Sequence, residues 1–343
     1  MGPIKSVIVL VIFRSSCINY LPSPCACFSE AADYEIGAYL CTSVPALLEK
    51  LEFLLALARE RHFGRAAETC GVTQPTLSAG IKQLEDRFGV LLVNRGSRFQ
   101  GFTAEGERVL DWARRIVGDT RAMRQEVHAL KHGLAGKLRL AAIPTALAMV
   151  ETLTTPFRAR HPEVQFTVLS RTSIEILAHL ENLEIDAGLT YLDNEPLGRV
   201  TAVPLYRERY RLLVAADGPL GDRDEVTWAE VAQVPLCLLT PDMQNRRIIE
   251  RLLRETGTDP NITLESDSMI LLYSHVRTGR WASVMPARLA ASLGLTDVLR
   301  AIPIVKPEAA HTIGLVAPAR EPMTTLTAAL VSEARRIAPL LID

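Results

Sequence analysis

The chain lacks the signatures of several enzyme classes. Its 343 residues contain no Gly-x-Ser-x-Gly, Gly-x-x-x-x-Gly-Lys, His-Glu-x-x-His or Gly-x-Gly-x-x-Gly segment, and its seven histidines fall in no zinc-binding motif. These absences argue against a serine hydrolase, a P-loop nucleotide hydrolase, a zinc peptidase and a dinucleotide-dependent oxidoreductase. We therefore expect a protein that is not an enzyme and that uses no cofactor or metal ion.

A strong excess of charge is also missing. The formal net charge is −1, so the molecule as a whole offers no positive field to nucleic acid. Any affinity for nucleic acid must then come from a local group of cations. One such group lies within residues 65–98 and consists of Arg65, Lys82, Arg87, Arg95 and Arg98.

The first 43 residues hold a hydrophobic run that is too short to cross a bilayer. Residues 7–13 are apolar and follow Lys5, as in the core of an export signal, but no clean small-x-small cleavage site follows. We interpret residues 1–43 as a poorly ordered extension, or as the product of a start site placed too far upstream. A genuine export signal is the alternative.

Cysteine is scarce outside that extension. Four of the six cysteines lie within it, at Cys17, Cys25, Cys27 and Cys41, and Cys25 and Cys27 have no partners at zinc-like spacing. The other two, Cys70 and Cys237, fall in a predicted helix and a predicted apolar strand. We expect both to be reduced and buried, as is usual in a cytoplasm.

Residues 63–88 predict two short helices joined by a tight turn. Small residues on the first helix allow close approach of the second, and Gly71 suits a helix C-terminus with positive φ. Thr73 is a plausible N-cap of the second helix, whose apolar positions Leu77, Ile81 and Leu84 recur at helical spacing. The opposite face presents groups that suit base edges and phosphates: Gln74, Thr76, Ser78 and Lys82.

This segment resembles the winged helix-turn-helix of the LysR-type transcriptional regulators. The resemblance rests on residues 72–78 (Val-Thr-Gln-Pro-Thr-Leu-Ser), residues 81–85 (Ile-Lys-Gln-Leu-Glu) and the later segments 91–95 and 102–106. It implies contacts to double-stranded promoter DNA, with bases near residues 74–78 and phosphates or the minor groove near the cations. The DNA-binding residues that we predict are Arg65, Thr73, Gln74, Pro75, Thr76, Ser78, Lys82, Arg95 and Arg98.

The predicted DNA-binding domain spans residues 44–103 and is mainly α-helical. A first helix covers the helix-turn-helix, and residues 90–103 form a two-stranded wing. Residues 104–132 then form a long linker helix capped by Thr103. Apolar residues one heptad apart predict a dimer seam along it. These positions are Val109, Ile116, Met123 and Leu130, interleaved with Ala113, Thr120 and Val127.

Residues 137–343 alternate between strand and helix patterns, which predicts a parallel sheet with helices on both faces. The pattern is similar to the effector-binding domain of the same family, which has two Rossmann-like lobes as in periplasmic binding proteins. Lobe I is expected at about 137–207 plus 306–343, and lobe II at about 208–305. The chain would cross between them near residues 206–209 and 304–307.

In such sheets a ligand binds beyond the carboxyl ends of the strands. Polar side chains at four predicted strand ends favour a small carboxylate or other oxyanion. The family motif places effector contacts at three of these side chains, Thr145, Thr172 and Ser173. The predicted effector-binding residues are Thr145, Arg171, Thr172, Ser173, Thr240, Gln244 and Ser268. Arg171 departs from the small or polar residue that the family favours. Thr145, Ser173 and Ser268 could instead only cap helices.

The sequence therefore favours a cytoplasmic LysR-type regulator that forms a homodimer or homotetramer, is not membrane-bound and contacts RNA polymerase. Its effector half is loosely similar to regulators found beside formate dehydrogenase operons. Some family members sense oxidants through two cysteines of the effector domain, but here only Cys237 lies there. An exported two-lobed solute-binding protein is the main alternative, although it leaves residues 44–103 unexplained.

Overall fold

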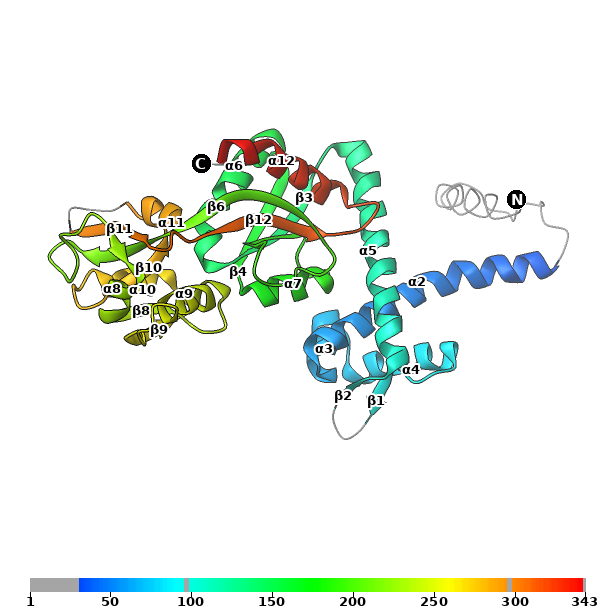
Figure 1. Cartoon of the computed structure of the whole chain (residues 1–343). Helices are drawn as coiled ribbons and strands as arrows, with labels where there is room; N and C mark the ends of the chain where they lie inside the picture. Colours follow the sequence, from blue (N-terminus) through cyan, green and yellow to red (C-terminus); the bar gives the residue numbers. More distant parts are fainter. Residues whose placement is uncertain (1–30, 96–98, 295–297, 342–343) are drawn as a thin grey trace.

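The computed structural model describes residues 31–95, 99–294 and 298–341. An N-terminal helical domain and a larger α/β domain are joined by one long helix, α5 (Ala104–His132) (Figure 1). In the described residues, no helix is both long and apolar enough to cross a membrane.

The N-terminal domain is a winged helix-turn-helix, as expected from the sequence. It contains α2 (Ala31–Glu60), α3 (Phe63–Cys70), α4 (Gln74–Phe88) and the antiparallel strands β1 (Val93–Arg95) and β2 (Phe99–Phe102). Its core is formed by buried side chains from α2, α3, α4, the first turns of α5 and the segment that enters the wing. They include Leu54, Leu57, Ala66, Leu77, Ile81, Leu84, Leu92 and Leu110.

The turn between α3 and α4 is built as the sequence predicts. Gly71 ends α3 with φ 67°, a conformation that glycine adopts without a steric penalty, and Thr73 caps the N-terminus of α4. Gly80 lets α4 approach α2 closely, because a Cβ atom there would lie 2.7 Å from a ring carbon of Phe53. The close packing fixes the outer face of α4 relative to the domain.

The first helix is longer than the sequence suggests. Residues 31–43, assigned to an irregular extension, form the first turns of α2, and the expected boundary at residue 44 therefore lies inside a helix. The rest of that extension, residues 1–30, lies outside the described residues. Gly37 and Pro45, both unfavourable in the interior of a helix, lie within this element.

The α/β domain begins with lobe I. Its strands β3 (Gly136–Ala142), β4 (Val164–Ser170) and β5 (Ala187–Tyr191) are parallel in the order β4-β3-β5. Helices η1 (Pro144–Met149), α6 (Glu151–Arg160), α7 (Ser173–Glu181) and the C-terminal α12 (Thr325–Leu341) pack around this sheet (Figure 1). Its core is continuous with that of lobe II.

In the described residues, lobe II contains four short helices and five short strands. The helices α8 (Trp228–Gln233), α9 (Gln244–Arg254) and α10 (Met269–Val276) accompany β8 (Leu236–Leu239) and β9 (Ile262–Ser266), which pair in parallel. The remaining elements are β7 (Val226–Thr227), β10 (Ser283–Pro286), α11 (Ala287–Ser292) and β11 (Leu299–Val305).

The two lobes are joined by a pair of antiparallel strands, β6 (Val200–Ala215) and β12 (Ala310–Pro318). The parallel sheet predicted from the sequence was therefore wrong at this point. Strand β6 runs antiparallel to β12 up to the Arg209–Ala310 pair, and from Tyr210 onward it pairs with β10 and β11. The sheet is mixed because the chain enters lobe II along β6 and returns along β12 in the opposite direction.

Candidate DNA-binding face and effector cleft

The predicted base-contacting residues lie together on the outer face of α4. Thr73, Gln74, Pro75, Thr76 and Lys82 are exposed, whereas Ser78 is half-buried. The opposite face of the helix buries its leucines and Ile81 in the domain core. The N-terminal half of α4 therefore presents short polar groups that match the size and hydrogen-bonding capacity of base edges.

Two threonines at the start of α4 also hold the helix end. The Thr73 hydroxyl accepts a hydrogen bond from the backbone N–H of Thr76 at 3.4 Å, and the two hydroxyl oxygens are 2.8 Å apart. These contacts satisfy an N–H group that would otherwise lack a partner within the helix. A base contact from Thr76 would add to this local role.

The predicted cations are distributed over three elements. Arg65 is exposed on α3, where its Nη2 donates to the carbonyl oxygen of Glu60 at 2.7 Å. Arg87 is exposed in the last turn of α4, and Arg95 is the last residue of β1. Arg98 lies outside the described residues.

Sequence reasoning missed Glu85, which connects α4 to the wing. This glutamate is 5% exposed, and its Oε1 accepts hydrogen bonds from the backbone N–H groups of Leu92 at 3.0 Å and Val93 at 3.2 Å. A signal was available, because Glu85 lies four residues after Ile81, on the apolar face of the helix.

A cleft of about 510 Å³ separates the lobes at the carboxyl ends of the strands. It is lined by residues from lobe I and lobe II: Pro144, Leu147, Ser170, Arg171, Thr172, Glu175, Asp242, Met243, Asp267, Ser268, Met269 and Ile270. Three of the predicted effector residues, Arg171, Thr172 and Ser268, are among them. Its size is in the range of small-molecule sites.

The other four predicted effector residues do not line this cleft. Thr145 and Ser173 are buried, and Ser173 Oγ donates to Glu195 at 3.4 Å. Gln244 is buried as well, and its side-chain amide donates to the carbonyl oxygen of Asp193 at 3.1 Å. Thr240 is half-buried, and its carbonyl oxygen accepts from the Met243 N–H. Spacing along the chain could not distinguish side chains that face the cleft from those that turn inward.

The cleft carries more carboxylates than the sequence led us to expect. Glu175, Asp242 and Asp267 line it together with one cation, Arg171. Glu175 is already engaged, because it accepts from the Thr172 N–H at 2.9 Å while the Thr172 hydroxyl caps α7. Arg171 Nη1 donates to its neighbour's carbonyl oxygen, that of Ser170, at 2.7 Å. The cleft can therefore both donate to and accept from a ligand.

A buried polar cluster lies where the two lobes join. Tyr191 donates to Glu208 Oε1, and Asn245 Nδ2 donates to the Tyr191 hydroxyl at 3.0 Å. Burial raises the pKa of Glu208 to about 8, although the hydrogen bond from Tyr191 opposes the shift. Within the described residues, Glu208 Oε2 and the Tyr210 hydroxyl have no hydrogen-bond partner.

The two cysteines with described side chains are reduced. Cys237 is fully buried, as expected, whereas Cys70 is only half-buried. Burial raises the pKa of the Cys237 thiol to about 11 and also raises that of Cys70. A raised pKa disfavours the thiolate, which is the reactive form. Neither thiol has the properties of a redox-sensing cysteine. No group of three or more His, Cys, Asp or Glu side chains in the described part of the chain is arranged to hold a metal ion.

A winged helix-turn-helix, a long connecting helix and a two-lobed domain with a ligand-sized cleft define a ligand-responsive DNA-binding regulator. Residues 48–107 match the bacterial regulatory helix-turn-helix of the LysR family, and residues 131–338 match the LysR substrate binding domain. The chain belongs to the LysR family of transcriptional regulators, whose members are not enzymes. Neither match supports an exported solute-binding protein.

Several proteins are similar to this chain over most of its length. It is 30% identical over 270 residues to the DNA-binding transcriptional dual regulator OxyR of Escherichia coli K12, a match that covers 78% of this chain and 88% of OxyR. A probable nitrogen assimilation transcriptional activator of Synechococcus elongatus is 28% identical over 276 residues, which covers 79% of this chain and 88% of that protein.

Solved structures of full-length regulators have the same architecture. A cysteine-to-aspartate variant of OxyR from Pseudomonas aeruginosa superposes with a TM-score of 0.67 at 27% identity, covering 85% of this chain and 96% of that one. CbnR in complex with its target DNA has a TM-score of 0.55 at 22% identity, with 85% and 99% coverage. The family resemblance predicted from the helix-turn-helix is confirmed, as is the DNA-binding role.

Proposed function

We propose that this regulator reads promoter DNA in the major groove with the N-terminal half of α4. Gln74, Pro75, Thr76 and Ser78 would approach the bases, and Lys82 and Arg65 would contact phosphates. Arg95 and Arg98 of the wing would reach the backbone or the minor groove, where arginine is favoured by a narrow groove. The observation that carries this proposal is the polar, exposed outer face of α4 opposite a fully buried apolar face.

We further propose that the interlobe cleft binds a small carboxylate or related oxyanion that also carries hydrogen-bond donors. Arg171 of lobe I supports the anionic part of the ligand, and Ser268 of lobe II offers it a hydroxyl. Asp242 and Asp267 favour donors such as hydroxyl or ammonium groups on the same ligand. A simple anion would leave these two carboxylates uncompensated.

The ligand would act by changing how far the lobes close on each other. Since a ligand can shift a conformational equilibrium only through unequal affinity for the two states, the effector must contact both lobes in the closed form. Closure would change the spacing of paired DNA-binding domains in the homo-oligomer and therefore the bend of the promoter. Such a regulator would act in the cytoplasm, where it would also contact RNA polymerase.

An exposed apolar stripe on α5 is the proposed dimer seam. Ile116, Met123, Val127 and Leu130 are 42–82% exposed, and Trp112 is 62% exposed on the same helix. Two residues that the heptad pattern also placed in the seam pack instead on the DNA-binding domain: Ala113 is buried in its core, and Val109 is half-buried against it. An apolar stripe of this length at helical spacing is typical of a helix that packs on a second copy.

A mobility-shift experiment with the full chain tests both proposals. DNA from its own upstream region should be retarded in the presence of nonspecific competitor, and one member of a panel of small carboxylates, including formate, should change the shift. Arg171→Gln should keep the basal shift and lose the response, whereas Arg158→Gln on α6 should keep both. A response that survives in Arg171→Gln contradicts the effector site, and the lack of any specific shift contradicts the DNA-binding role.

A further inference from the structure

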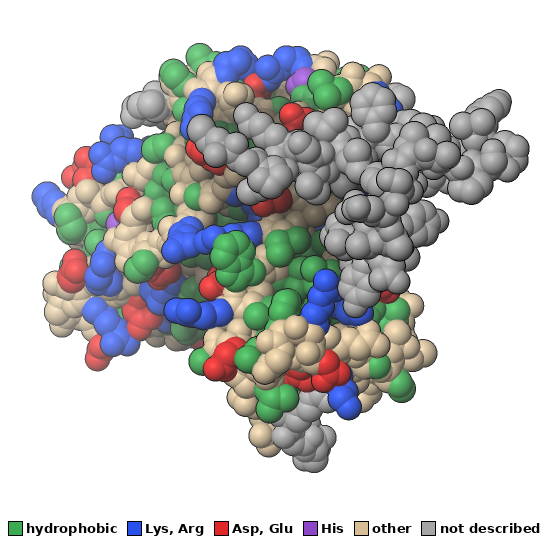
Figure 2. Space-filling model, turned by 90° about the vertical axis from the view of Figure 1, so that its right-hand side faces the viewer, with side chains coloured by type: hydrophobic (Ala, Val, Ile, Leu, Met, Phe, Trp, Pro, Cys, Tyr) green, Lys and Arg blue, Asp and Glu red, His purple; other side chains and the backbone are tan. Residues whose placement is uncertain are grey.

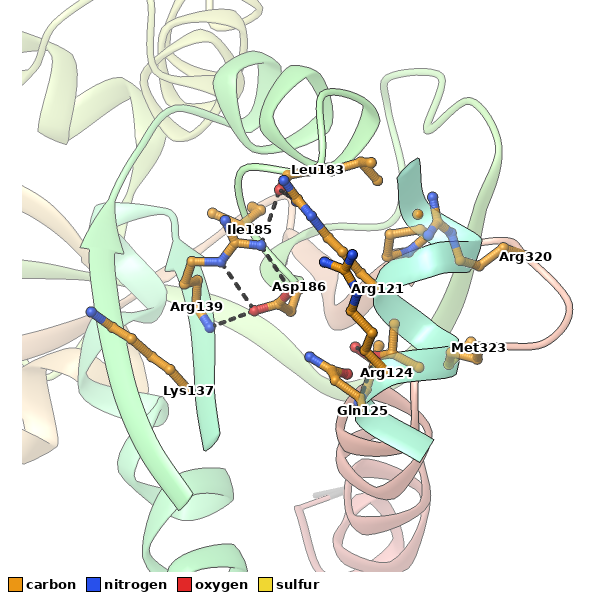
Figure 3. A pocket seen from close by; sticks show the side chains of 14 residues that line it. Arg121, Arg124, Gln125, Lys137, Arg139, Leu183, Ile185, Asp186, Arg320 and Met323 are labelled. Atoms are coloured by element: carbon orange, nitrogen blue, oxygen red, sulfur yellow. Dashed lines mark hydrogen bonds and ion pairs between the residues drawn. The ribbon is translucent and has the colours of Figure 1, made fainter. Parts of the chain in front are cut away.

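A second cavity, of about 380 Å³, lies between α5 and lobe I. It is distinct from the interlobe cleft, because no residue lines both. Figure 3 shows side chains of α5, of strand β3 and of the segment that leads into α12 around it. Five cations and one carboxylate line it: Arg121, Arg124, Lys137, Arg139, Arg320 and Asp186. In Figure 2, which views the molecule from the α5 side, Lys and Arg side chains are prominent between the two domains.

The single carboxylate is already neutralised. Asp186 Oδ2 accepts from the backbone N–H of Arg139 at 2.7 Å, and its Oδ1 accepts from Arg139 Nη2 at 3.0 Å (Figure 3). Arg121 and Arg139 both donate to the carbonyl oxygen of Leu183, at 3.2 and 3.0 Å. Two guanidinium groups are thereby held side by side although they repel each other.

The other three cations have no ion-pair partner among the described residues. Arg124 and Lys137 are exposed at the mouth of the cavity. Arg320 lies against the backbone of α5, because a Cβ atom at Gly118 would be only 2.0 Å from its Nη1. Burial lowers the pKa of Arg320, opposed by the charge of Asp119. Burial and the charge of Arg139 lower the pKa of Arg121, opposed by the charges of Glu52 and Asp186.

The cavity also offers neutral hydrogen-bonding groups. Gln125 Oε1 is buried and has no partner within the described part of the chain. Thr324 and Thr327 line the opposite side, with their hydroxyl oxygens 2.8 Å apart. A ligand with several acceptor oxygens and at least one hydroxyl or acidic proton would satisfy both kinds of group.

We propose that this cavity binds a small oxyanion with two or more negative charges, of the phosphate or polycarboxylate type. Guanidinium groups bind such oxygens with paired, charge-assisted hydrogen bonds. A multiply charged anion would offset the mutual repulsion of the cations, which is screened least by water at the half-buried Arg139 and Arg320. The volume accommodates a small metabolite but not a macromolecular segment of any length.

The bound anion would connect α5 to the effector domain. Arg121, Arg124 and Gln125 belong to α5, Lys137 and Arg139 belong to β3, and Arg320 precedes α12. Occupancy would therefore restrict the angle of the helix that joins the DNA-binding domain to lobe I. This consequence rests on the proposed regulatory function, whereas the binding itself does not depend on it.

Titration calorimetry on the full chain tests the site, with pyrophosphate and citrate as probes at constant ionic strength. We expect saturable binding of one anion per chain, weakened at least tenfold in Arg124→Gln/Lys137→Gln. Arg335→Gln, which removes a cation from the exposed surface of α12 outside the cavity, should bind like the wild type. Preference for pyrophosphate indicates a phosphorylated ligand, and preference for citrate indicates a polycarboxylate.

Three outcomes overturn the proposal. The first is that neither probe binds saturably to the wild type. The second is that Arg124→Gln/Lys137→Gln binds the probes as tightly as the wild type. The third is that Arg171→Gln loses binding while the double variant keeps it in full. The last would place the anion in the interlobe cleft. A mobility shift of the double variant distinguishes failure of the anion site from failure of the DNA-binding role, because this variant should still bind specific DNA in the absence of anion.

Discussion

The Tyr191 hydroxyl donates a hydrogen bond to Glu208 Oε1 at the junction of the two lobes, and both side chains are almost completely buried. Tyr191 ends β5 of lobe I, and Glu208 lies on β6 shortly before that strand enters lobe II. Asn245 of lobe II completes the contact through the Tyr191 hydroxyl. The cluster therefore joins the lobes beneath the cleft whose closure we propose to be regulated.

This cluster predicts a pH dependence of stability. The pKa of Glu208 is about 8 when folded, because of burial, and 4.5 is its ordinary value. Between pH 4.5 and 8 the folded chain holds a proton that the unfolded chain releases, so the contribution of Glu208 to stability is fully present below pH 4.5 and falls as pH rises through this window. Glu208→Gln carries no such proton. We expect it to gain about 1 kcal/mol per pH unit relative to the wild type across the window.

Chemical denaturation at pH 5 and pH 9 checks this expectation. The stability difference between Glu208→Gln and the wild type should be larger at pH 9 by several kcal/mol, by the same linkage argument. Glu225→Gln, at an exposed glutamate without described contacts, is the matched control and should track the wild type. A difference for Glu208→Gln that is independent of pH would show that the carboxyl does not retain its proton in the folded state.

The hydrogen bonds between Glu85 and the wing predict that removing this side chain lowers the stability of the folded protein. Glu85→Ala leaves the backbone N–H groups of Leu92 and Val93 without their acceptor in a buried setting. Loss of a buried acceptor costs about 1–3 kcal/mol. Thermal unfolding should show this destabilisation, and Asp86→Ala, at the adjacent exposed position, should stay within about 0.5 kcal/mol of the wild type. Equal stability of the two variants would contradict a structural role for Glu85.

Lys82 and Gln74 should have different effects on DNA binding. Lys82→Ala should weaken binding similarly on all sequences and reduce the salt slope by about 1, as expected for loss of one phosphate contact. Gln74→Ala should cost about 1–3 kcal/mol on the operator and relax the preference at one base pair. Fluorescence anisotropy at several salt concentrations separates the two effects, with exposed Gln83→Ala as the control. A Lys82→Ala variant with unchanged salt slope would remove that residue from the interface.

The sequence was most informative where local chemistry sets structure. Gly71 and Thr73 determine the turn and the cap through backbone conformation and one hydroxyl, and the apolar periodicity of α4 fixes its buried face. Glu85 and Glu208 could not be interpreted in the same way, because their roles depend on backbone and side-chain groups of other segments, namely the Leu92 N–H and the Tyr191 hydroxyl. The acidic character of the cleft was missed for the same reason.

The cationic cavity shows the same limit over a longer range. Arg121 and Arg320 are separated by almost two hundred residues, and in the sequence each resembles an ordinary surface charge. Only the packing of α5 against lobe I, with Gly118 beneath the guanidinium of Arg320, brings them to one site. Likewise Ala113 fits the heptad pattern, but the DNA-binding domain covers that face of α5.

The apolar stripe on α5 predicts how the oligomer can be dissociated. Leu130 is 82% exposed and Val127 is 52% exposed, so neither side chain contributes much to the core of one chain. Val127→Glu/Leu130→Glu would place two carboxylates against the partner's copy of the same stripe, where they would lose solvation without gaining partners. We expect this variant to remain folded and to shift to a lower oligomeric state in sedimentation velocity, with weaker retention of a two-site operator. Glu126→Gln, on the same helix and also exposed, should assemble like the wild type. An unchanged sedimentation profile for the double variant would exclude the stripe as the seam and would favour a dimer formed by other surfaces.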